Sequence, residues 1–321
     1  MRRDNTIIII CLVLCAALLA GCGGAAAPSS GEAQPLRVVC TVFPLWDWTR
    51  NVLGAEAEGV ELTLLLGSGV DLHSFQPGVD DMVTLSRCDL LIYVGGESDD
   101  WIADALSESV NPKQRALNLL DILGDEVYAE ELREGMVGEA EEDAPDEHIW
   151  LSPRRAALLT QAIADALCEL DEGHAAQYKA NAAAYLAELD ELEADCAALA
   201  AADKLPLLVA DRFPFRYLAE DCGLDYYAAF SGCSAETGAS FETVAFLAGK
   251  ADEYGLPAIC VTESPISGVA EAVQRACATA KPEIVTLDSM QSVTRAEAES
   301  SSYVGIMKSN LEIIELIVWR T

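Results

Sequence analysis

The sequence predicts an α/β protein with two similar lobes, each a parallel or mixed sheet with flanking helices, joined by one long rigid helix. In the first half of the chain, apolar strand-like runs alternate with helical segments. The same alternation returns in the second half, and the stretch between the halves, residues 174–201, contains no glycine or proline. At 321 residues the chain is long enough for two ordinary domains.

The N-terminal segment is typical of a targeting signal. Two arginines precede an apolar run at residues 7–20, which is too short to span a bilayer core of about 30 Å. The run closes with the sequence LAGC at Cys22, which resembles a bacterial lipoprotein signal; an ordinary secretory signal is the alternative. We therefore expect a signal peptide at residues 1–21, a flexible tether at 22–35, and an extracytoplasmic protein held at the membrane by a lipid on Cys22.

The first lobe is expected at residues 36–172. Its apolar, β-branched runs predict strands at 38–43, 60–66 and 89–96, and the segments between and after them predict helices at 44–53, 79–88 and 101–106. Ligands of parallel α/β sheets bind beyond the carboxyl ends of the strands. The loop after Leu66 is therefore expected at a binding rim, and it carries His73.

Two further helices are expected, one at 153–170 at the end of the first lobe and one at 174–201, separated by Gly173. At 1.5 Å per residue the second spans about 40 Å, so the segment 173–202 is predicted to be an interlobe helix. Residues 125–147 are acidic and rich in turn formers, which predicts a mobile surface loop ending at His148.

The second lobe is expected at residues 203–321. It repeats the alternation, with strands at 205–211, 224–230, 258–264 and 283–289 and helices at 214–222, 241–254, 266–278 and 303–318. The last helix carries Val304, Met307 and Leu311 at helical spacing, which predicts one buried face. Two such lobes on a rigid helix imply a cleft between them.

The composition narrows the class of partner. The chain has 53 acidic and 20 basic residues, a formal net charge of −33, which argues against nucleic acids and anionic membrane surfaces as partners. It has eleven cysteines, and none of those after Cys22 forms a CxxC pair. Most lie in apolar or helical patterns, where cysteine acts as a small hydrophobe. Export would permit disulfides, and Cys222 with Cys233 is the most plausible pair.

Histidine is scarce, with three residues in the chain. His73 lies in LLLGSGVDLHSFQP and His148 in DEHIWLSP, each at the edge of a regular element with carboxylates nearby. Two such imidazoles indicate one divalent metal site built from separate segments. The alternative is that each is a hydrogen-bonded structural residue. His174 begins the long helix, where a capping or surface role is expected.

Several longer motifs resemble one family in register. VVCTVFPLWDWTRNVLG, the two histidine motifs, DRFPFRYLAEDCGL, CSAETGASFETVAFLA and the TESPIS loop are similar to segments of the ZnuA-like solute-binding lipoproteins of bacterial ABC transporters for zinc and manganese. The resemblance covers nearly the whole chain after the tether. It implies a monomeric receptor, not an enzyme, that captures a divalent metal between its lobes and delivers it to an ABC permease.

The resemblance also implies four metal ligands, two from each lobe. The first two fall on His73 and His148. The third position aligns with Arg212, whose guanidinium has no lone pair to offer and must turn away or pair with a carboxylate. The fourth aligns with Ser267, so nearby carboxylates are taken as substitutes. The candidate ligands are therefore His73, His148, Asp211, Glu263 and Glu236.

Two imidazoles with carboxylates suit zinc or manganese, and the nitrogen ligands favour zinc, as the transported ion. Two other functions are compatible with a metal site. An extracellular metal-dependent hydrolase needs an open coordination position and a general base, and the sequence has no HExxH motif. A surface adhesin would use the metal only for structural stability.

Overall fold

A computed structural model describes residues 34–54, 59–137, 144–200, 204–234, 238–263 and 268–319. By its contacts the chain divides into two units, residues 1–35 and 36–321. Only Gln34 and Pro35 of the first unit are described, so the predicted signal peptide and Cys22 lie outside the described residues. The second unit contains every element discussed below. No helix in the described ranges is both long and apolar enough for a membrane span.

The first sheet has four parallel strands in the order β2-β1-β3-β4. They are β1 (Leu36–Cys40), β2 (Val60–Leu64), β3 (Leu90–Tyr93) and β4 (Arg115–Asn118). Strand β4 was not predicted, because it is short and its residues are at most half-buried, so it lacks an apolar run. It lies at one edge of the sheet, where one side of the strand is unpaired.

The helices that accompany this sheet agree with the predicted ones and add one, α5. They are α2 (Phe43–Leu53), α3 (Val79–Arg87), α4 (Trp101–Ser107), α5 (Leu119–Leu123) and α6 (Pro153–Leu170), with short 3-10 helices η1 (Leu72–Ser74), η2 (Glu97–Asp99), η3 (Gly124–Glu126) and η4 (Ile149–Leu151). Proline opens α2 and α6, and Ser152 caps α6 by accepting a hydrogen bond from the Arg155 amide. This sheet and its helices are called the first lobe.

The second sheet repeats the arrangement, with four parallel strands in the order β6-β5-β7-β8. Its strands are β5 (Leu207–Phe213), β6 (Tyr226–Ser231), β7 (Ala258–Val261) and β8 (Glu283–Thr286). Its helices are α8 (Arg216–Asp221), α9 (Phe241–Tyr254), α10 (Val269–Ala276), α11 (Arg295–Ser300) and α12 (Tyr303–Val318). This is the second lobe. The predicted fold class, two α/β lobes with parallel sheets, is confirmed.

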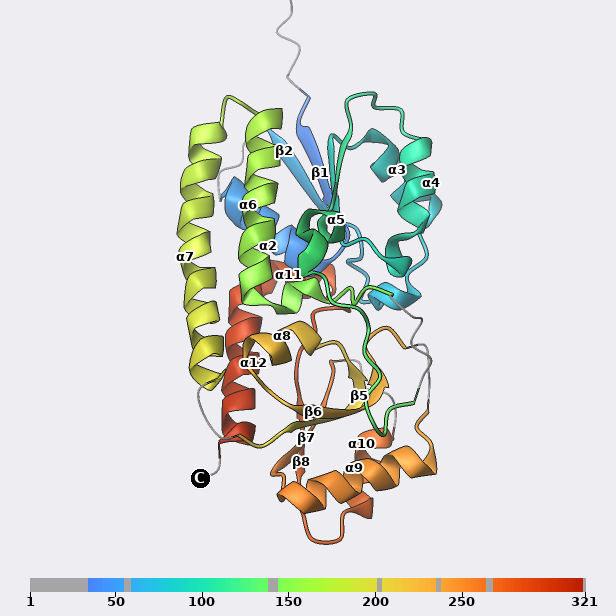
Figure 1. Cartoon of the computed structure of the whole chain (residues 1–321). Helices are drawn as coiled ribbons and strands as arrows, with labels where there is room; N and C mark the ends of the chain where they lie inside the picture. Colours follow the sequence, from blue (N-terminus) through green and yellow to red (C-terminus); the bar gives the residue numbers. More distant parts are fainter. Residues whose placement is uncertain are drawn as a thin grey trace, which may run out of the picture. The chain divides into compact units, whose positions relative to one another are not determined.

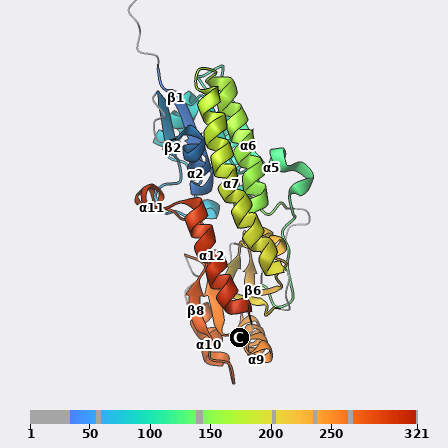
Figure 2. The same ribbon diagram turned by 90° about the vertical axis from the view of Figure 1, so that its left-hand side faces the viewer.

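Helix α7 (Ala175–Ala200) joins the lobes and is 26 residues long. It runs beside α6 and α12 in both views (Figures 1 and 2) and contacts both. Its buried residues recur every three or four positions, from Tyr178 to Leu199. Asp47 of α2 adds a polar tie, because its carboxylate accepts hydrogen bonds from the Tyr185 hydroxyl (3.3 Å) and from the Tyr303 amide at the start of α12 (3.1 Å).

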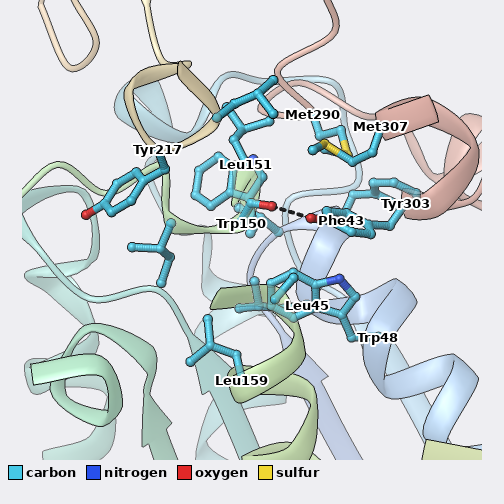
Figure 3. Packing of buried hydrophobic residues seen from close by; sticks show 14 of the residues in the cluster. Phe43, Leu45, Trp48, Trp150, Leu151, Leu159, Tyr217, Met290, Tyr303 and Met307 are labelled. Carbon is cyan, nitrogen blue, oxygen red and sulfur yellow. Dashed lines mark hydrogen bonds between the residues drawn. The ribbon is translucent and has the colours of Figure 1, made fainter. Parts of the chain in front are cut away.

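The largest apolar cluster contains residues of both lobes. Figure 3 shows its centre, where Trp48 and Tyr303 pack edge to face with ring centroids 5.4 Å apart. The Tyr303 hydroxyl donates a hydrogen bond of 2.6 Å to the carbonyl oxygen of Trp150. Trp150 and Tyr303 are fully buried, so this contact fixes η4 against α12. The residue two positions before Trp150 is His148.

The predicted mobile surface loop, 125–147, differs from the structure at its end. Glu130 donates its amide to the Ala144 carbonyl oxygen (2.7 Å), and Val137 donates to the Ala229 carbonyl oxygen of the second lobe (2.9 Å). Asp146 and Glu147 are buried, each 2 % exposed. The prediction is therefore wrong for these acidic residues, which are held inside because they interact with the site described next. Residues 138–143 lie outside the described residues.

Candidate metal centre

His148 is held by the residues just before it. Asp146 Oδ1 accepts hydrogen bonds from the His148 amide (2.9 Å) and from its ring Nδ1 (2.8 Å). Asp146 is itself fixed, because the Tyr217 hydroxyl donates to its carbonyl oxygen (2.8 Å). An imidazole that donates from Nδ1 to a carboxylate presents the lone pair of Nε2, the arrangement common behind metal-bound histidines. His148 is fully buried.

His73 reaches the same point from the loop that follows β2. It lies in η1, which Asp71 caps by accepting a hydrogen bond from the His73 amide (2.9 Å). Its ring Nδ1 lies 2.8 Å from Ser98 Oγ, and its Nε2 lies 3.2 Å from Nε2 of His148. The two ring centroids are 5.2 Å apart. The structure thus brings together two imidazoles 75 positions apart in the sequence, with their Nε2 atoms facing each other.

A thiol completes the group. The donor atoms of His73, His148 and Cys233 all lie within 4.8 Å of one another, and no other such group of three or more occurs among the described residues. In a tetrahedral zinc site, Zn–N bonds of about 2.0–2.1 Å place two nitrogens roughly 3.3 Å apart. The observed 3.2 Å between the imidazole nitrogens fits that geometry.

The two histidines differ in pKa, because their burial and their charged neighbours act differently on each ring. Burial, with His148 and Arg212 adding to it, lowers the pKa of His73 to about 3, although Asp71 acts in the opposite direction. Burial also disfavours a charged His148, but the Asp146 carboxylate outweighs it and raises the pKa of His148 above its usual value. His73 is therefore neutral at physiological pH, whereas a cation at His148 must compete with a proton.

Glu147 was not singled out from the sequence, although it precedes His148 directly. Its Oε1 accepts a hydrogen bond from the Ser98 amide (2.9 Å), and its Oε2 lies 3.7 Å from Nδ1 of His73. Oε2 is buried and has no hydrogen-bond partner within the described part of the chain. Gly96, at φ 81°, makes room for it, since a Cβ there would lie 2.4 Å from Glu147 Oε1. Burial raises the pKa of this carboxyl.

Arg212 pairs with Asp71. The distance from Arg212 Nη2 to Asp71 Oδ2 is 2.6 Å, and both side chains are 15 % exposed. The expectation that this guanidinium pairs with a carboxylate is confirmed. Burial alone would raise the pKa of Asp71, but Arg212 and His73 hold it below its usual value.

Asp211 has other partners. Its Oδ1 accepts from the Arg212 amide (2.9 Å), and its Oδ2 accepts from the amide (3.2 Å) and hydroxyl (2.8 Å) of Thr262. This carboxylate is fully buried between β5 and the end of β7. The structure does not bring Asp211 into the group of donor atoms around His73 and His148. Its role as a ligand stays a prediction.

The other predicted carboxylates are likewise outside the group. Glu263 accepts hydrogen bonds from the Ser289 amide (2.7 Å), the Ser289 hydroxyl (2.6 Å) and the Gln291 amide (3.0 Å), so it holds the loop after β8. Glu236 and Ser267 lie outside the described residues. As ligands, Glu263 and Glu236 stay predictions.

The remaining sequence predictions concern His174 and the pairing of Cys222 with Cys233. His174 is exposed and its Nδ1 lies 2.7 Å from Asp171 Oδ2, a surface role as expected. The predicted disulfide between Cys222 and Cys233 is wrong, because both are free thiols. Cys222 is buried in the largest apolar cluster. Cys233 follows β6 in the CSAETG motif, and its sequence setting gives no sign that it faces two histidines.

Comparison with curated proteins finds relatives along most of the chain. The zinc-binding protein AdcA of Streptococcus pyogenes serotype M1 is 26% identical over 293 residues, which is 88% of this chain and 56% of that protein. The chain thus spans about half the length of the streptococcal relatives it matches. The high-affinity zinc uptake system protein ZnuA of Bacillus subtilis is 25% identical over 311 residues, 95% of each chain.

Solved structures share the fold. The Zn(II)-bound ZnuA-like domain of Streptococcus pneumoniae AdcA has a TM-score of 0.69 and 24% identity, covering 88% of this chain and 98% of that one. The periplasmic zinc-binding protein TroA of Treponema pallidum has a TM-score of 0.70 and 22% identity, covering 88% and 99%. The family model described as zinc-uptake complex component A, periplasmic, matches residues 38–316. The chain therefore belongs to the ZnuA family.

Proposed function

We propose that this protein is an extracytoplasmic solute-binding protein that captures a zinc ion and delivers it to an ABC permease, while a lipid on Cys22 holds it at the membrane. The observation that carries the proposal is the 3.2 Å distance between Nε2 of His73 and Nε2 of His148. Family membership and the zinc-binding relatives support the same reading.

The residues around the histidines suit reversible capture. Asp146 orients His148 and polarises its imidazole, while Ser98 and Glu147 lie at Nδ1 of His73. Both rings can therefore donate Nε2 to an ion without reorganising, which makes binding less costly. Glu147 Oε2 has no hydrogen-bond partner among the described residues and lies 3.7 Å from Nδ1 of His73, so it needs a small shift to accept a hydrogen bond from that ring. Imidazole donors suit zinc, and manganese is the second candidate cargo.

The test is calorimetric titration of the purified protein with zinc and with manganese. We expect His73→Ala and His148→Ala each to lose at least about 100-fold in zinc affinity, because each removes a ligand rather than only its support. His174→Ala is the matched control, because His174 is exposed and pairs with Asp171. Equal zinc affinity of the parent and the double variant His73→Ala/His148→Ala would refute the site.

Transport needs its own measurement. A strain that lacks the gene is grown under zinc limitation and complemented with the parent, with His148→Ala or with His174→Ala. We expect the parent and His174→Ala to restore zinc uptake and His148→Ala to fail. If zinc uptake does not depend on the gene, the protein binds zinc for another purpose, such as the structural role of a metal in an adhesin.

A further inference from the structure

We propose that the thiolate of Cys233 is the third protein ligand of the captured ion, so that the second lobe contributes sulfur where a carboxylate was predicted. This inference rests on the proposed function, since it assigns a donor and a metal preference to the same site. The proposed donor is a single side chain, in the loop after β6.

The sulfur of Cys233 lies close to both imidazoles. Cys233 Sγ and the ring nitrogens of His73 and His148 lie within 4.8 Å of one another. Zn–S bonds of about 2.3 Å and Zn–N bonds of about 2.0–2.1 Å place sulfur and nitrogen roughly 3.6 Å apart in a tetrahedral site. The remaining difference, at most about 1.2 Å, must close when the ion binds. The cluster is therefore close to a His2Cys site.

Contacts of the loop after β6 hold Cys233 near the two histidines. Gly232 lies against the His148 ring, and a Cβ on it would come within 2.9 Å of His148 Cε1 and 3.0 Å of the Phe213 carbonyl oxygen. The next residue is anchored, because the Cys233 amide donates to Glu130 Oε1 (3.0 Å). The loop thus passes the Cε1 and Nδ1 edge of the imidazole at backbone distance, and the following residue carries its sulfur to within 4.8 Å of a ring nitrogen of each histidine.

The other described side chains considered as donors from the second lobe are engaged elsewhere. Arg212 cannot ligate and is paired with Asp71. Asp211 is hydrogen-bonded to Thr262, and Glu263 to Ser289 and Gln291. Among the described residues of the second lobe, Cys233 alone belongs to the donor group.

The donor set has a consequence for the cargo. Thiolates favour zinc and other borderline or soft ions, whereas manganese prefers oxygen donors. On binding, the Cys233 S–H bond is broken, the sulfur electron pair forms the S–Zn bond, and the proton leaves to solvent. The site is therefore specific for a thiophilic dication, and manganese binds much more weakly than it does to sites completed by carboxylates.

The test uses Co²⁺ as a spectroscopic probe of the full-length mature protein. A cobalt–thiolate bond gives an intense sulfur-to-metal charge-transfer absorption in the near ultraviolet, which nitrogen and oxygen ligands do not give. We expect the band in the parent protein, its loss in Cys233→Ser, and its retention in Cys277→Ser, the control at the end of α10. Calorimetry should show a zinc affinity about 100-fold lower in Cys233→Ser, with the manganese affinity nearly unchanged.

Two outcomes separate this inference from the proposed function. If the parent binds zinc and cobalt but its cobalt complex lacks the band, or the band persists in Cys233→Ser, Cys233 is not a ligand and the receptor function stands. If the parent binds neither ion, both proposals fail. A measurement on the parent alone guards against misfolding of the variant: zinc should protect Cys233, but not Cys277, from alkylation mapped by mass spectrometry, and equal alkylation with and without zinc overturns the assignment.

Discussion

Asp71 and Arg212 form an ion pair between the two lobes directly beside the histidine pair, with Arg212 Nη2 2.6 Å from Asp71 Oδ2. Asp71 also caps the short helix that carries His73. The Asp71 carboxylate thus positions His73, a candidate ligand. It also neutralises Arg212, which occupies a position where relatives of this family are expected to carry a ligand. The charge balance of this pair should control metal affinity.

Substitutions at the two residues should act in opposite directions. Arg212→Gln leaves the Asp71 charge uncompensated and should tighten zinc binding on the order of tenfold, about 1.4 kcal/mol. Asp71→Asn keeps the cap oxygen but leaves Arg212 unpaired, and should weaken binding by a similar factor. Calorimetric titration at low and high salt checks both effects. Shifts of the same sign in the two variants would show that the pair acts through structure rather than charge.

Asp146 is expected to support His148 without touching the ion. Asp146→Asn retains an oxygen for the His148 amide and ring but removes the negative charge that polarises the imidazole. Zinc affinity should fall about 10- to 100-fold, the usual effect of removing such a partner. The control is Asp121→Asn, an exposed residue of α5. Competition with a chromogenic zinc chelator measures both, and an unchanged affinity in Asp146→Asn contradicts the assigned role.

Gly232 should be intolerant of a side chain for reasons of space. In Gly232→Ala the new Cβ would lie 2.9 Å from His148 Cε1, so the ring or the loop must move. We expect weaker zinc binding together with lower thermal stability. Gly249→Ala is a matched control in α9, where a Cβ meets nothing within 4 Å and helix propensity should add about 0.5–1 kcal/mol of stability. Zinc affinity equal to the parent in Gly232→Ala would show that the loop adapts.

Asp99 should make stability depend on pH. Burial, with a contribution from Glu147, raises its pKa to about 7. A raised folded-state pKa means that the protonated carboxyl stabilises the fold below the unfolded pKa of roughly 4, and that this contribution, up to about 4 kcal/mol, is lost as pH rises through 7. Asp99→Asn should therefore gain stability relative to the parent between pH 4 and pH 8. Urea unfolding at several pH values measures the difference, and a difference independent of pH would contradict it.

Asp47 should contribute strongly to stability because it joins three helices. It is fully buried and accepts hydrogen bonds from Tyr185 of α7 and from the Tyr303 amide of α12. Asp47→Ala leaves these donors and Arg50 without their acceptor and should cost about 3 kcal/mol in the free energy of unfolding. Asp190→Ala, at an exposed position of α7, should change it by less than about 0.5 kcal/mol. Denaturant titration compares the two, and equal costs would contradict the role of Asp47.

Much of the fold could be predicted from hydrophobic periodicity and helix-start signals. The helix over Phe241–Tyr254 follows from its apolar spacing and from Ser240, which caps it by accepting from the Thr243 amide. The sequence did not predict strand β4 or helix α11, since β4 is a short edge strand and α11 has one buried residue. Neither carries enough apolar surface to make a periodic pattern.

The candidate site could be predicted only in part. His73 and His148 stand out because histidine is rare and each follows a recognisable element boundary. Cys233 and Glu147 could not be found in that way, because their importance comes from tertiary contacts: the loop after β6 passes the His148 ring at Gly232, and Gly96 admits the Glu147 carboxylate. Asp211 and Glu263 were chosen by proximity in sequence, which does not reveal that Thr262 and Ser289 engage them.

Hydrogen bonds join the segment around His148 to the second lobe at several points. These bonds limit how a bound ion can be released. The Tyr217 hydroxyl donates to Asp146 (2.8 Å), the Tyr303 hydroxyl to Trp150 (2.6 Å), and the Trp150 indole to the Ser289 carbonyl oxygen (2.8 Å). Swinging the lobes widely apart would break all three bonds, so we expect the cargo to depart by a local displacement instead. His73 is 9% exposed against 0% for His148, so under the proposed transport role we expect the ion to leave, and a permease to receive it, on the His73 side.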